Sequence, residues 1–356
     1  MNRYNSTMPK PGKKPKQPPV TRIPDDKCFS NTQLQLFQNF FATSDDERRY
    51  SNTVELWDAT PKYHISRRRQ SAMRQGLFLP TVEHQFMHRG RPFTVRIDPA
   101  RVRVNGEFVE FYPAVSEELV EDALRKIAAD QQLGLGYMDA TRSGVRFTIH
   151  MLRKELAARG HTRSYSQIHE SLMILSGCHV VITSNDSEEI VSSGILNSLA
   201  GVTRARLEQD PKASWYADFC PLVTHGIRTL SYRQFDYHKM MGHSTQLARW
   251  FYKRLCHVFT QASHINPYGP IKLSTIERDS GLLDDNRRSK IAKRVRDVLE
   301  ELVKRSVLSR YTETIERGAR NSILDIEYVL FPHADFIKEV KAANARAKKH
   351  RDIVAG

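Results

Sequence analysis

The sequence predicts an α+β protein in which one order of helices and strands occurs twice, after a disordered N-terminal arm. Residues 1–50 are rich in proline and lysine, as flexible segments are. Two later stretches, 116–196 and 245–330, each combine apolar residues at helical spacing with short runs of strand-like alternation. At 356 residues and 40% hydrophobic residues, the chain is long enough for about two compact domains.

The arm, residues 1–50, contains one apolar island. The five prolines and four lysines between Pro9 and Pro19 cannot supply a buried core, so a flexible basic arm is expected. Further along, Gln33-Leu34-Gln35-Leu36-Phe37 stands alone in polar surroundings. An exposed apolar run lowers solubility unless it docks on a partner. Gln33, Leu34, Leu36 and Phe37 are therefore candidate binding residues; the alternative is that this island packs on its own domain.

Residues 51–238 are predicted to form the first domain. Alternation at Phe93–Ile97, and again on both sides of Asn105-Gly106, indicates strands with a tight hairpin turn at the Asn-Gly pair. The elements expected next are a helix capped by Ser116, a strand at Val145–Ile149, helices at His150–Arg159 and 164–176, and a hairpin joining Cys178–Thr183 to Ile190–Leu196.

This order is that of a winged helix-turn-helix, in which the second helix of the pair is the recognition helix. In the first domain that helix is 164–176. Its solvent face offers Arg163, Ser166 and Gln167 to DNA, but also Glu170, which would repel phosphate. The first domain is therefore expected either to contact the DNA backbone or to serve in self-association.

Residues 239–337 repeat the order as a second winged domain. The expected elements are an amphipathic helix Thr245–Gln261, a strand Ile271–Leu273, a helix 275–282 capped by Ser274, a helix 287–305 capped by Asp284 or Asp285, and a hairpin of Val307–Tyr311 with Ile323–Leu330. The fold predicted for the chain is thus two tandem winged helix-turn-helix domains.

The helix 287–305 is the strongest candidate for reading DNA. Ile291, Val295, Val298 and Leu302 line one stripe, and acids occur only from Asp297 onward. A recognition helix presents its N-terminal residues to base edges, where Arg and Lys pair with guanine. The candidate base readers are Asn286, Ser289, Lys290 and Lys293, and the candidate phosphate contacts are Arg287, Arg288, Arg294, Arg296 and the hairpin-tip Arg317 and Arg320. The alternative is a basic helix that only maintains solubility.

The distribution of charge agrees with DNA binding. The formal net charge is +15, but the segments 1–30, 61–103, 287–305 and 338–356 together carry +22, which leaves −7 for all other residues. Positive charge gathered on a weakly acidic body is typical of nucleic-acid binding. Segment 61–103 is expected to contact the DNA backbone, and 338–356 to form a basic C-terminal tail.

Several classes of function lack their motifs in this sequence. A phosphate-binding G-x-x-x-x-G-K-[ST] loop and an H-E-x-x-H metal motif are absent, and no Cys/His set has zinc-finger spacing. The H-x-H pair of rolling-circle nicking enzymes is also missing. We therefore expect no catalytic residue, metal or cofactor. The four cysteines form no CxxC pair, and no apolar run is long enough to span a bilayer, which favours a reduced cytoplasmic location without a membrane.

These features resemble plasmid replication initiators of the TrfA-like kind. The resemblance is carried by Ile271-Lys-Leu273, Asp284-Asp-Asn-Arg287, Lys290 and Glu300-Glu-Leu302, in that order in the second domain. Gln33–Phe37 also looks like the Q-L-x-L-F peptide that binds the sliding clamp, and TrfA-like initiators have it upstream of their first domain, as here.

The resemblance implies a non-enzymatic protein that binds directly repeated origin sites, called iterons, and opens an adjacent A+T-rich region. It also implies recruitment of the host initiator, helicase and sliding clamp, and a balance between monomer and homodimer that sets plasmid copy number. Two alternatives remain: a transcriptional or partition regulator with tandem winged helices, and an origin-nicking enzyme. The clamp-like peptide disfavours the first, and the missing H-x-H disfavours the second.

Overall fold

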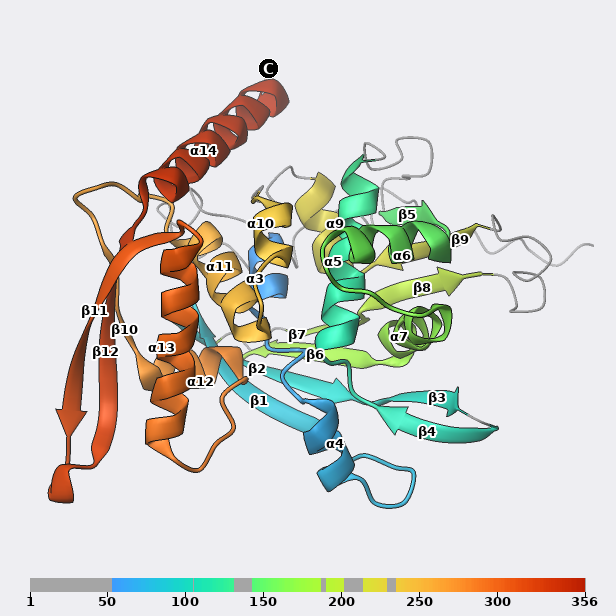
Figure 1. Ribbon diagram of the computed structural model, residues 1–356. Coiled ribbons are helices and arrows are strands. Elements are labelled where there is room, and N and C mark those ends of the chain that lie inside the picture. Colours follow the sequence, from blue (N-terminus) through green and yellow to red (C-terminus); the bar gives the residue numbers. More distant parts are fainter. Residues whose placement is uncertain are drawn as a thin grey trace, which may run out of the picture.

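The protein forms a mixed α/β body in which helices pack against several small antiparallel sheets (Figure 1). The computed structural model describes residues 53–104, 106–130, 143–186, 190–201, 214–228 and 235–355. The predicted arm, with Gln33, Leu34, Leu36 and Phe37, lies outside the described residues. Every helix among the residues described is too short or too polar to cross a membrane.

The first winged unit contains a three-stranded sheet and three helices. Along the chain the unit consists of α5 (Val115–Asp130), β5 (Gly144–Phe147), α6 (Ile149–Ala158), α7 (Tyr165–Gly177), β8 (Leu196–Ala200) and β9 (Trp215–Phe219). The hydroxyl of Thr148 caps α6, and that of Ser164 caps α7. In the sheet the order is β5-β9-β8, so the first strand pairs with the last.

The second winged unit has the same strand topology. Its elements are α11 (Gln246–Val258), β10 (Tyr268–Lys272), α12 (Leu273–Ser280), α13 (Arg288–Lys304), β11 (Leu308–Arg317) and β12 (Ile323–Pro332). The sheet order β10-β12-β11 again pairs the first strand with the last and leaves the middle one at the edge. Two winged helix-turn-helix units therefore occur in tandem, which confirms the predicted fold class.

An additional four-stranded sheet lies beside the first winged unit, and we call it the inserted sheet. Its strands are β1 (Val82–His88), β2 (Arg91–Asp98), β6 (His179–Ser184) and β7 (Ile190–Gly194), in the order β1-β2-β6-β7. The predicted hairpin of 178–196 exists, but its assignment as the first wing is wrong. Strand β6 pairs on its other side with β2, so the hairpin belongs to this sheet, and the wing is β8–β9.

The capping role predicted for Ser274 is also wrong. Helix α12 begins at Leu273, so Ser274 lies inside the helix, and the helix has no side-chain cap at its N-terminus. The backbone N–H and hydroxyl of Ser274 instead donate to the carboxylate of Asp325 on β12, the former at 3.1 Å. These bonds tie the start of α12 to the wing. They also lower the pKa of Asp325, although partial burial acts in the opposite direction.

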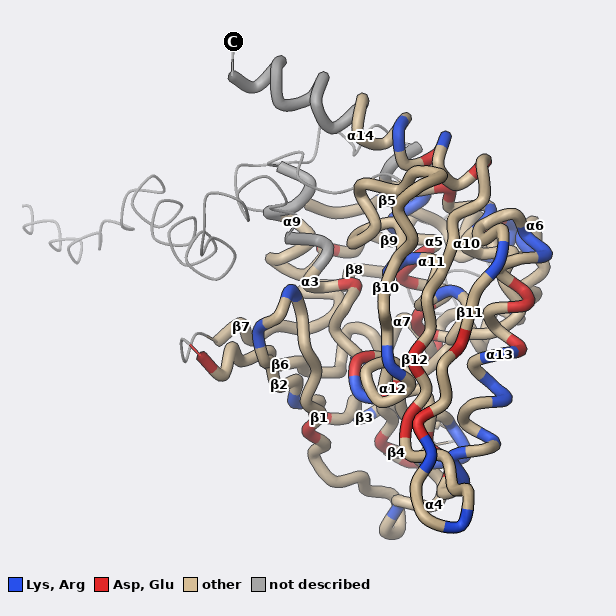
Figure 2. Tube along the Cα trace, turned by 90° about the vertical axis from the view of Figure 1, so that its left-hand side faces the viewer, with Lys and Arg blue, Asp and Glu red and all other residues tan. Residues whose placement is uncertain are grey.

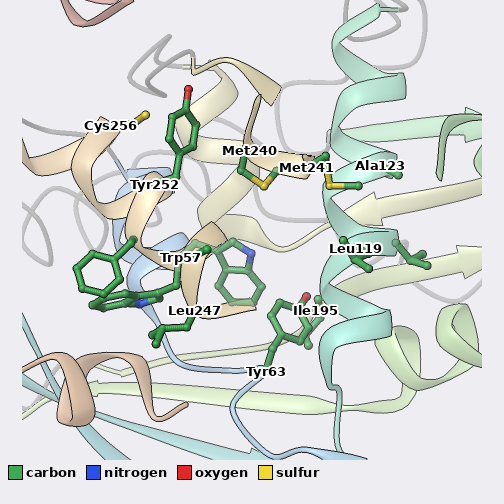
Figure 3. Packing of buried hydrophobic residues seen from close by; sticks show 14 of the residues in the cluster. Trp57, Tyr63, Leu119, Ala123, Ile195, Met240, Met241, Leu247, Tyr252 and Cys256 are labelled. Carbon is green, nitrogen blue, oxygen red and sulfur yellow. The ribbon is translucent and has the colours of Figure 1, made fainter. Parts of the chain in front are cut away.

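One continuous apolar core runs through both winged units and the inserted sheet. Figure 3 shows the part where α3 (Thr53–Ala59), α5, α10 (Tyr237–Met241) and α11 meet. Trp57 from α3, Leu119 from α5 and Leu247 from α11 are all buried there. Helix α9 (Pro221–Arg228) packs on α3 at the same centre. Because apolar burial is shared across the units, neither unit has a separate core.

Buried ion pairs join the first helices of the two winged units. The Lys253 ammonium on α11 lies 2.7 Å and 3.0 Å from the carboxylate oxygens of Asp122 on α5. One turn away, the guanidinium of Arg249 lies 3.4 Å from Glu118. All four side chains are less than a tenth exposed. Charges removed from water must be paired closely, so these contacts fix the position of α11 against α5.

The second unit also contacts the inserted sheet directly. The backbone N–H of Met87 on β1 donates to the carboxylate of Asp279 on α12 at 3.0 Å, and the ring of His84 lies 2.6 Å from the carbonyl of Arg278. The segment 338–355, expected as a basic tail, continues the helix α14 (Ala334–Ala355). Phe336, Ile337 and Val340 anchor that helix in the core.

Candidate nucleic-acid interface

Helix α13 presents a buried apolar face and an exposed basic face, as its sequence predicts. Ile291, Val295, Val298 and Leu302 are buried together with Ala292 and Leu299. Ser289, Lys290, Lys293 and Arg294 are exposed on the other side. The cap predicted for Asp284 or Asp285 is wrong, because the helix starts at Arg288 and has no side-chain cap at its N-terminus. The carboxylate of Asp285 instead accepts a bond from the backbone N–H of Arg287 at 2.9 Å. Asn286 and Arg287 are exposed in the turn before the helix.

Several of these cations have acidic partners close to the start of α13. Arg288 donates to Glu277 on α12 at 2.7 Å, which holds its guanidinium against the protein. Lys290 lies 3.8 Å from Asp285, and Arg294 lies 3.9 Å from Asp284. The side chain of Lys290 is 58% exposed in that pair. Such exposed pairs contribute little stability and can be exchanged for a phosphate, whereas Arg288 is half-buried and held.

Arg296 has a structural contact that its sequence position does not reveal. Its guanidinium donates two bonds to the carboxylate of Glu313 on β11, at 2.8 Å and 3.1 Å. Those bonds raise the pKa of Arg296 and brace the helix against the wing strand. Arg296 was predicted to contact phosphate, but in this structure its guanidinium is bonded to the Glu313 carboxylate.

The tip of the β11–β12 wing carries the remaining predicted phosphate contacts. Arg317 donates to the carbonyl of Asn321 at 3.2 Å, which holds the end of β11 across the tip. Arg320 is exposed and has a positive φ of 56°, a strained conformation for a residue with a Cβ. In Figure 2 the Lys and Arg positions of α13 run down the right-hand edge of the molecule toward the wing tip. The exposed face of α13 is thus basic, whereas the wing has arginines at its tip and acids along its strands: Glu313, Glu316, Asp325 and Glu327.

The start of α7 in the first unit is less available for reading bases. The side chain of Gln167 accepts a bond from the backbone N–H of Ser164 at 2.9 Å as part of a capping box. Ser166 is exposed, and its hydroxyl lies 3.2 Å from that of Ser164. Arg163 is half-exposed and donates to the carbonyl of Thr162 at 2.9 Å. All three predicted residues lie together, but Gln167 is committed to the cap.

The acid that seemed to oppose DNA in the first unit has a partner. Glu170 lies 3.9 Å from Arg67 on α4 (Arg67–Met73), which also contacts Glu117 at 2.9 Å. The sequence did not reveal two acidic side chains that bind arginines of α13. Glu277 bonds to Arg288, and Glu313 bonds to Arg296. Asp284 and Asp285 could be recognised from their place before the helix, but Glu277 and Glu313 come from other elements.

Comparison with solved structures finds several that resemble this chain to different degrees. The structure of RctB domains 2–3 has a TM-score of 0.50 and 11% identity, covering 81% of this chain and 99% of that chain. A selenomethionine derivative of RctB domains 2 and 3 has a TM-score of 0.46 and 12% identity, with 76% and 98% covered. The Pi initiator protein in complex with iteron DNA has a TM-score of 0.37 and 13% identity, with 67% and 98% covered.

At 11% identity, the likeness to RctB domains 2–3 concerns the fold alone. No protein-family model matches the chain, and no curated protein matches its sequence. Within the described ranges, no group of three or more His, Cys, Asp or Glu side chains is placed to bind a metal ion. The surface that stands out chemically is the exposed basic face of α13, together with Arg317 and Arg320 at the tip of the wing.

Proposed function

We propose that this protein is a plasmid replication initiator that binds directly repeated origin sites as double-stranded DNA, without catalysing a reaction. The second winged unit reads the site, with Asn286, Ser289, Lys290 and Lys293 toward base edges. The first unit adds backbone contacts or a homodimer surface. In this proposal the host initiator and helicase are recruited at the origin, and the monomer–dimer balance restrains copy number.

The observation that carries the proposal is the exposed face of α13 between Arg288 and Arg296. This face contains no acid, begins at the helix N-terminus and adjoins the basic wing tip. A helix of this width fits the major groove, and its first turns meet the base edges. A wing beside it follows the phosphate backbone. Lys293 is exposed on this face, which makes it the best-placed reader.

The sliding clamp is the second partner in the proposal. Its support is the Gln33–Phe37 sequence, since Leu36 and Phe37 suit an apolar cleft and Gln33 can bond at its rim. Replacing Leu36 and Phe37 by alanine should abolish capture by the purified clamp and leave DNA binding unchanged. Equal capture of both proteins would contradict the role given to this peptide.

Duplex binding is tested by footprinting on the DNA that flanks the gene. Direct repeats about two helical turns long, protected by the protein, are expected. Lys290→Ala with Lys293→Ala should weaken binding to the repeats more than to random duplex, because base contacts are lost along with charge. Lys304→Ala is the matched control, since Lys304 is exposed at the far end of the same helix.

Three results would redirect the proposal. Unchanged footprints for the Lys290 and Lys293 double variant would remove α13 as the reader. Protection of a single palindrome over a promoter would favour a transcriptional regulator. Cleavage of one strand in a supercoiled origin by the purified protein would favour a nicking enzyme.

A further inference from the structure

A surface on the far side of the molecule from α13 combines exposed aromatic rings with arginine. Phe78, in the turn after α4, is 53% exposed, and Phe108, on β4 (Glu107–Phe111), is 51% exposed. The guanidinium of Arg101 on β3 (Ala100–Val104) lies 5.5 Å from the ring centre of Phe78 and 5.4 Å from that of Phe108. We call these three side chains the aromatic platform.

The scaffold beneath the platform holds these side chains in place. The backbone N–H of Glu110 donates to the carbonyl of Leu77 at 3.0 Å, which fastens the Phe78 turn to β4. The carboxylate of Glu110 accepts a bond from the N–H of Leu79 at 2.7 Å. Strand β3 packs on α7, so the hairpin rests on the first winged unit. The exposed rings are thus positioned by backbone contacts and do not belong to a loose loop.

The platform also has a strongly basic surround. The segment 67–79 contains four arginines and no acid. Arg68 and Arg69 are exposed on α4, while Arg67 and Arg74 lie over the ring of Phe111 at 4.9 Å and 5.0 Å. One of the hairpin's two acids, Glu110, is committed to the Leu79 bond. The net charge of this region favours a polyanion as its ligand.

We propose that the aromatic platform binds single-stranded nucleic acid, with bases stacked on Phe78 and Phe108 and the backbone held by the surrounding arginines. Exposed aromatic side chains with interleaved arginines are the arrangement on which unpaired bases stack. The bases of a duplex are already stacked on each other and present only their edges, so this surface discriminates in favour of unpaired strands. The site is independent of the duplex reader on α13, and Figure 1 shows the β3–β4 hairpin and α13 at opposite sides of the molecule.

The test is fluorescence anisotropy with a labelled oligothymidylate, which forms no hairpins, alongside a labelled random duplex at the same salt concentration. Phe78→Ala and Phe108→Ala should each weaken oligothymidylate binding by about five- to a hundredfold, the range measured for loss of one stacked base. Arg101→Lys should also weaken it, because an ammonium keeps the charge but loses the planar face. Duplex affinity should stay the same in all three variants.

Ile190→Ala supplies the control for removing an exposed apolar side chain, since Ile190 on β7 is 56% exposed. It should change neither affinity. The variant with Lys290→Ala and Lys293→Ala should keep its oligothymidylate affinity, which shows that the two sites are separate. Circular dichroism and thermal melting confirm that the platform variants are folded, as expected for residues that are half-exposed.

Five outcomes would overturn the inference. The single-strand site does not exist if the wild-type protein fails to bind oligothymidylate. The same holds if the platform variants bind oligothymidylate as well as the wild type does. Equal losses on oligothymidylate and duplex would make the platform a duplex-backbone contact. Loss of single-strand binding in the α13 variant would mean one shared surface. A change in molecular mass with unchanged oligothymidylate binding would assign the platform to self-association. If repeats are not preferred over random duplex, the proposed function fails, but this inference does not.

Discussion

Replacing Lys253 by methionine should be among the most damaging single changes in this protein. Lys253 is buried, with its ammonium 2.7 Å from Asp122 and 3.6 Å from Glu118. The cluster around it is balanced, with four carboxylates against four cations: Asp58, Glu118, Glu121, Asp122, Lys62, Arg125, Arg249 and Lys253. Methionine fills much of the same volume, so the change mainly removes a charge and leaves one buried carboxylate without its closest partner.

Breaking a buried ion pair in this way costs about 3–5 kcal/mol. At roughly 2 °C per kcal/mol for a protein of this size, the melting temperature should fall by about 6–10 °C. Arg125, whose guanidinium is 4.0 Å from Asp122, screens part of the loss, which favours the lower end of the range. The assay is urea denaturation followed by circular dichroism, together with a thermal melt.

A double-mutant cycle separates the charge effect from packing. Asp122→Asn added to Lys253→Met removes both charges and restores balance, so the double variant should be more stable than Lys253→Met alone. The coupling between the two sites should exceed about 1 kcal/mol. A loss below about 1 kcal/mol for Lys253→Met, or a double variant no more stable than it, would refute this reasoning.

The pH dependence of Lys253→Met gives an independent check. Burial already raises the pKa of Asp122, and loss of the ammonium raises it further. A carboxyl group whose pKa is higher in the folded than in the unfolded protein destabilises the fold at high pH. This penalty shrinks as the pH falls below the folded-state pKa and is gone below the unfolded-state pKa. The deficit of the variant should therefore shrink as the pH falls from neutral toward about 4, the pKa of an aspartate in the unfolded protein. A deficit that grows on acidification would contradict the mechanism.

Three further changes follow from the structure. Gly281→Ala should lower the stability of the fold more than Gly76→Ala does. Both glycines have φ +63°, but a Cβ at Gly281 would lie 2.8 Å from a neighbouring histidine, whereas a Cβ at Gly76 would meet open space. Equal urea midpoints for the two variants would contradict this. Burial raises the pKa of the Cys220 thiol to about 11, so alkylation followed by mass spectrometry should require unfolding, and rapid labelling of native protein would be the contrary result. Glu313→Gln removes the carboxylate that holds Arg296, which should strengthen duplex binding at low salt. Weaker binding would show that the Arg296–Glu313 contact itself is needed for binding.

The parts of the fold that sequence predicted well are those fixed by local chemistry. The recognition helix expected at 287–305 is found at Arg288–Lys304, and the one expected at 164–176 is found at Tyr165–Gly177. The helical spacing of apolar residues can be recognised within one or two turns of the sequence. The first wing was missed because strand pairing is not local. Strand β6 is a short apolar run that can be assigned to a hairpin with β7, yet its second partner is β2, far earlier in the chain.

The candidate site shows the same limit. Its cations on α13 were predictable because an exposed, acid-free helix face is visible in the sequence. Their partners were not, because Glu277 reaches Arg288 from α12 and Glu313 reaches Arg296 from β11. Those contacts depend on how the elements pack. The aromatic platform was likewise hidden, since Phe78 and Phe108 are brought together only by the turn after α4 and the β3–β4 hairpin.

The shared core holds the two winged units at a fixed distance and orientation. Helices α5 and α11 are pinned by buried charges and by one apolar core, so the two recognition helices cannot swing apart independently. If both touch one DNA site, a single inserted base pair moves the far half by about 3.4 Å and turns it by roughly 35°. A rigid pair of helices cannot follow that turn. Such a protein would tolerate substitution at many positions of its site far better than any change in the length of that site.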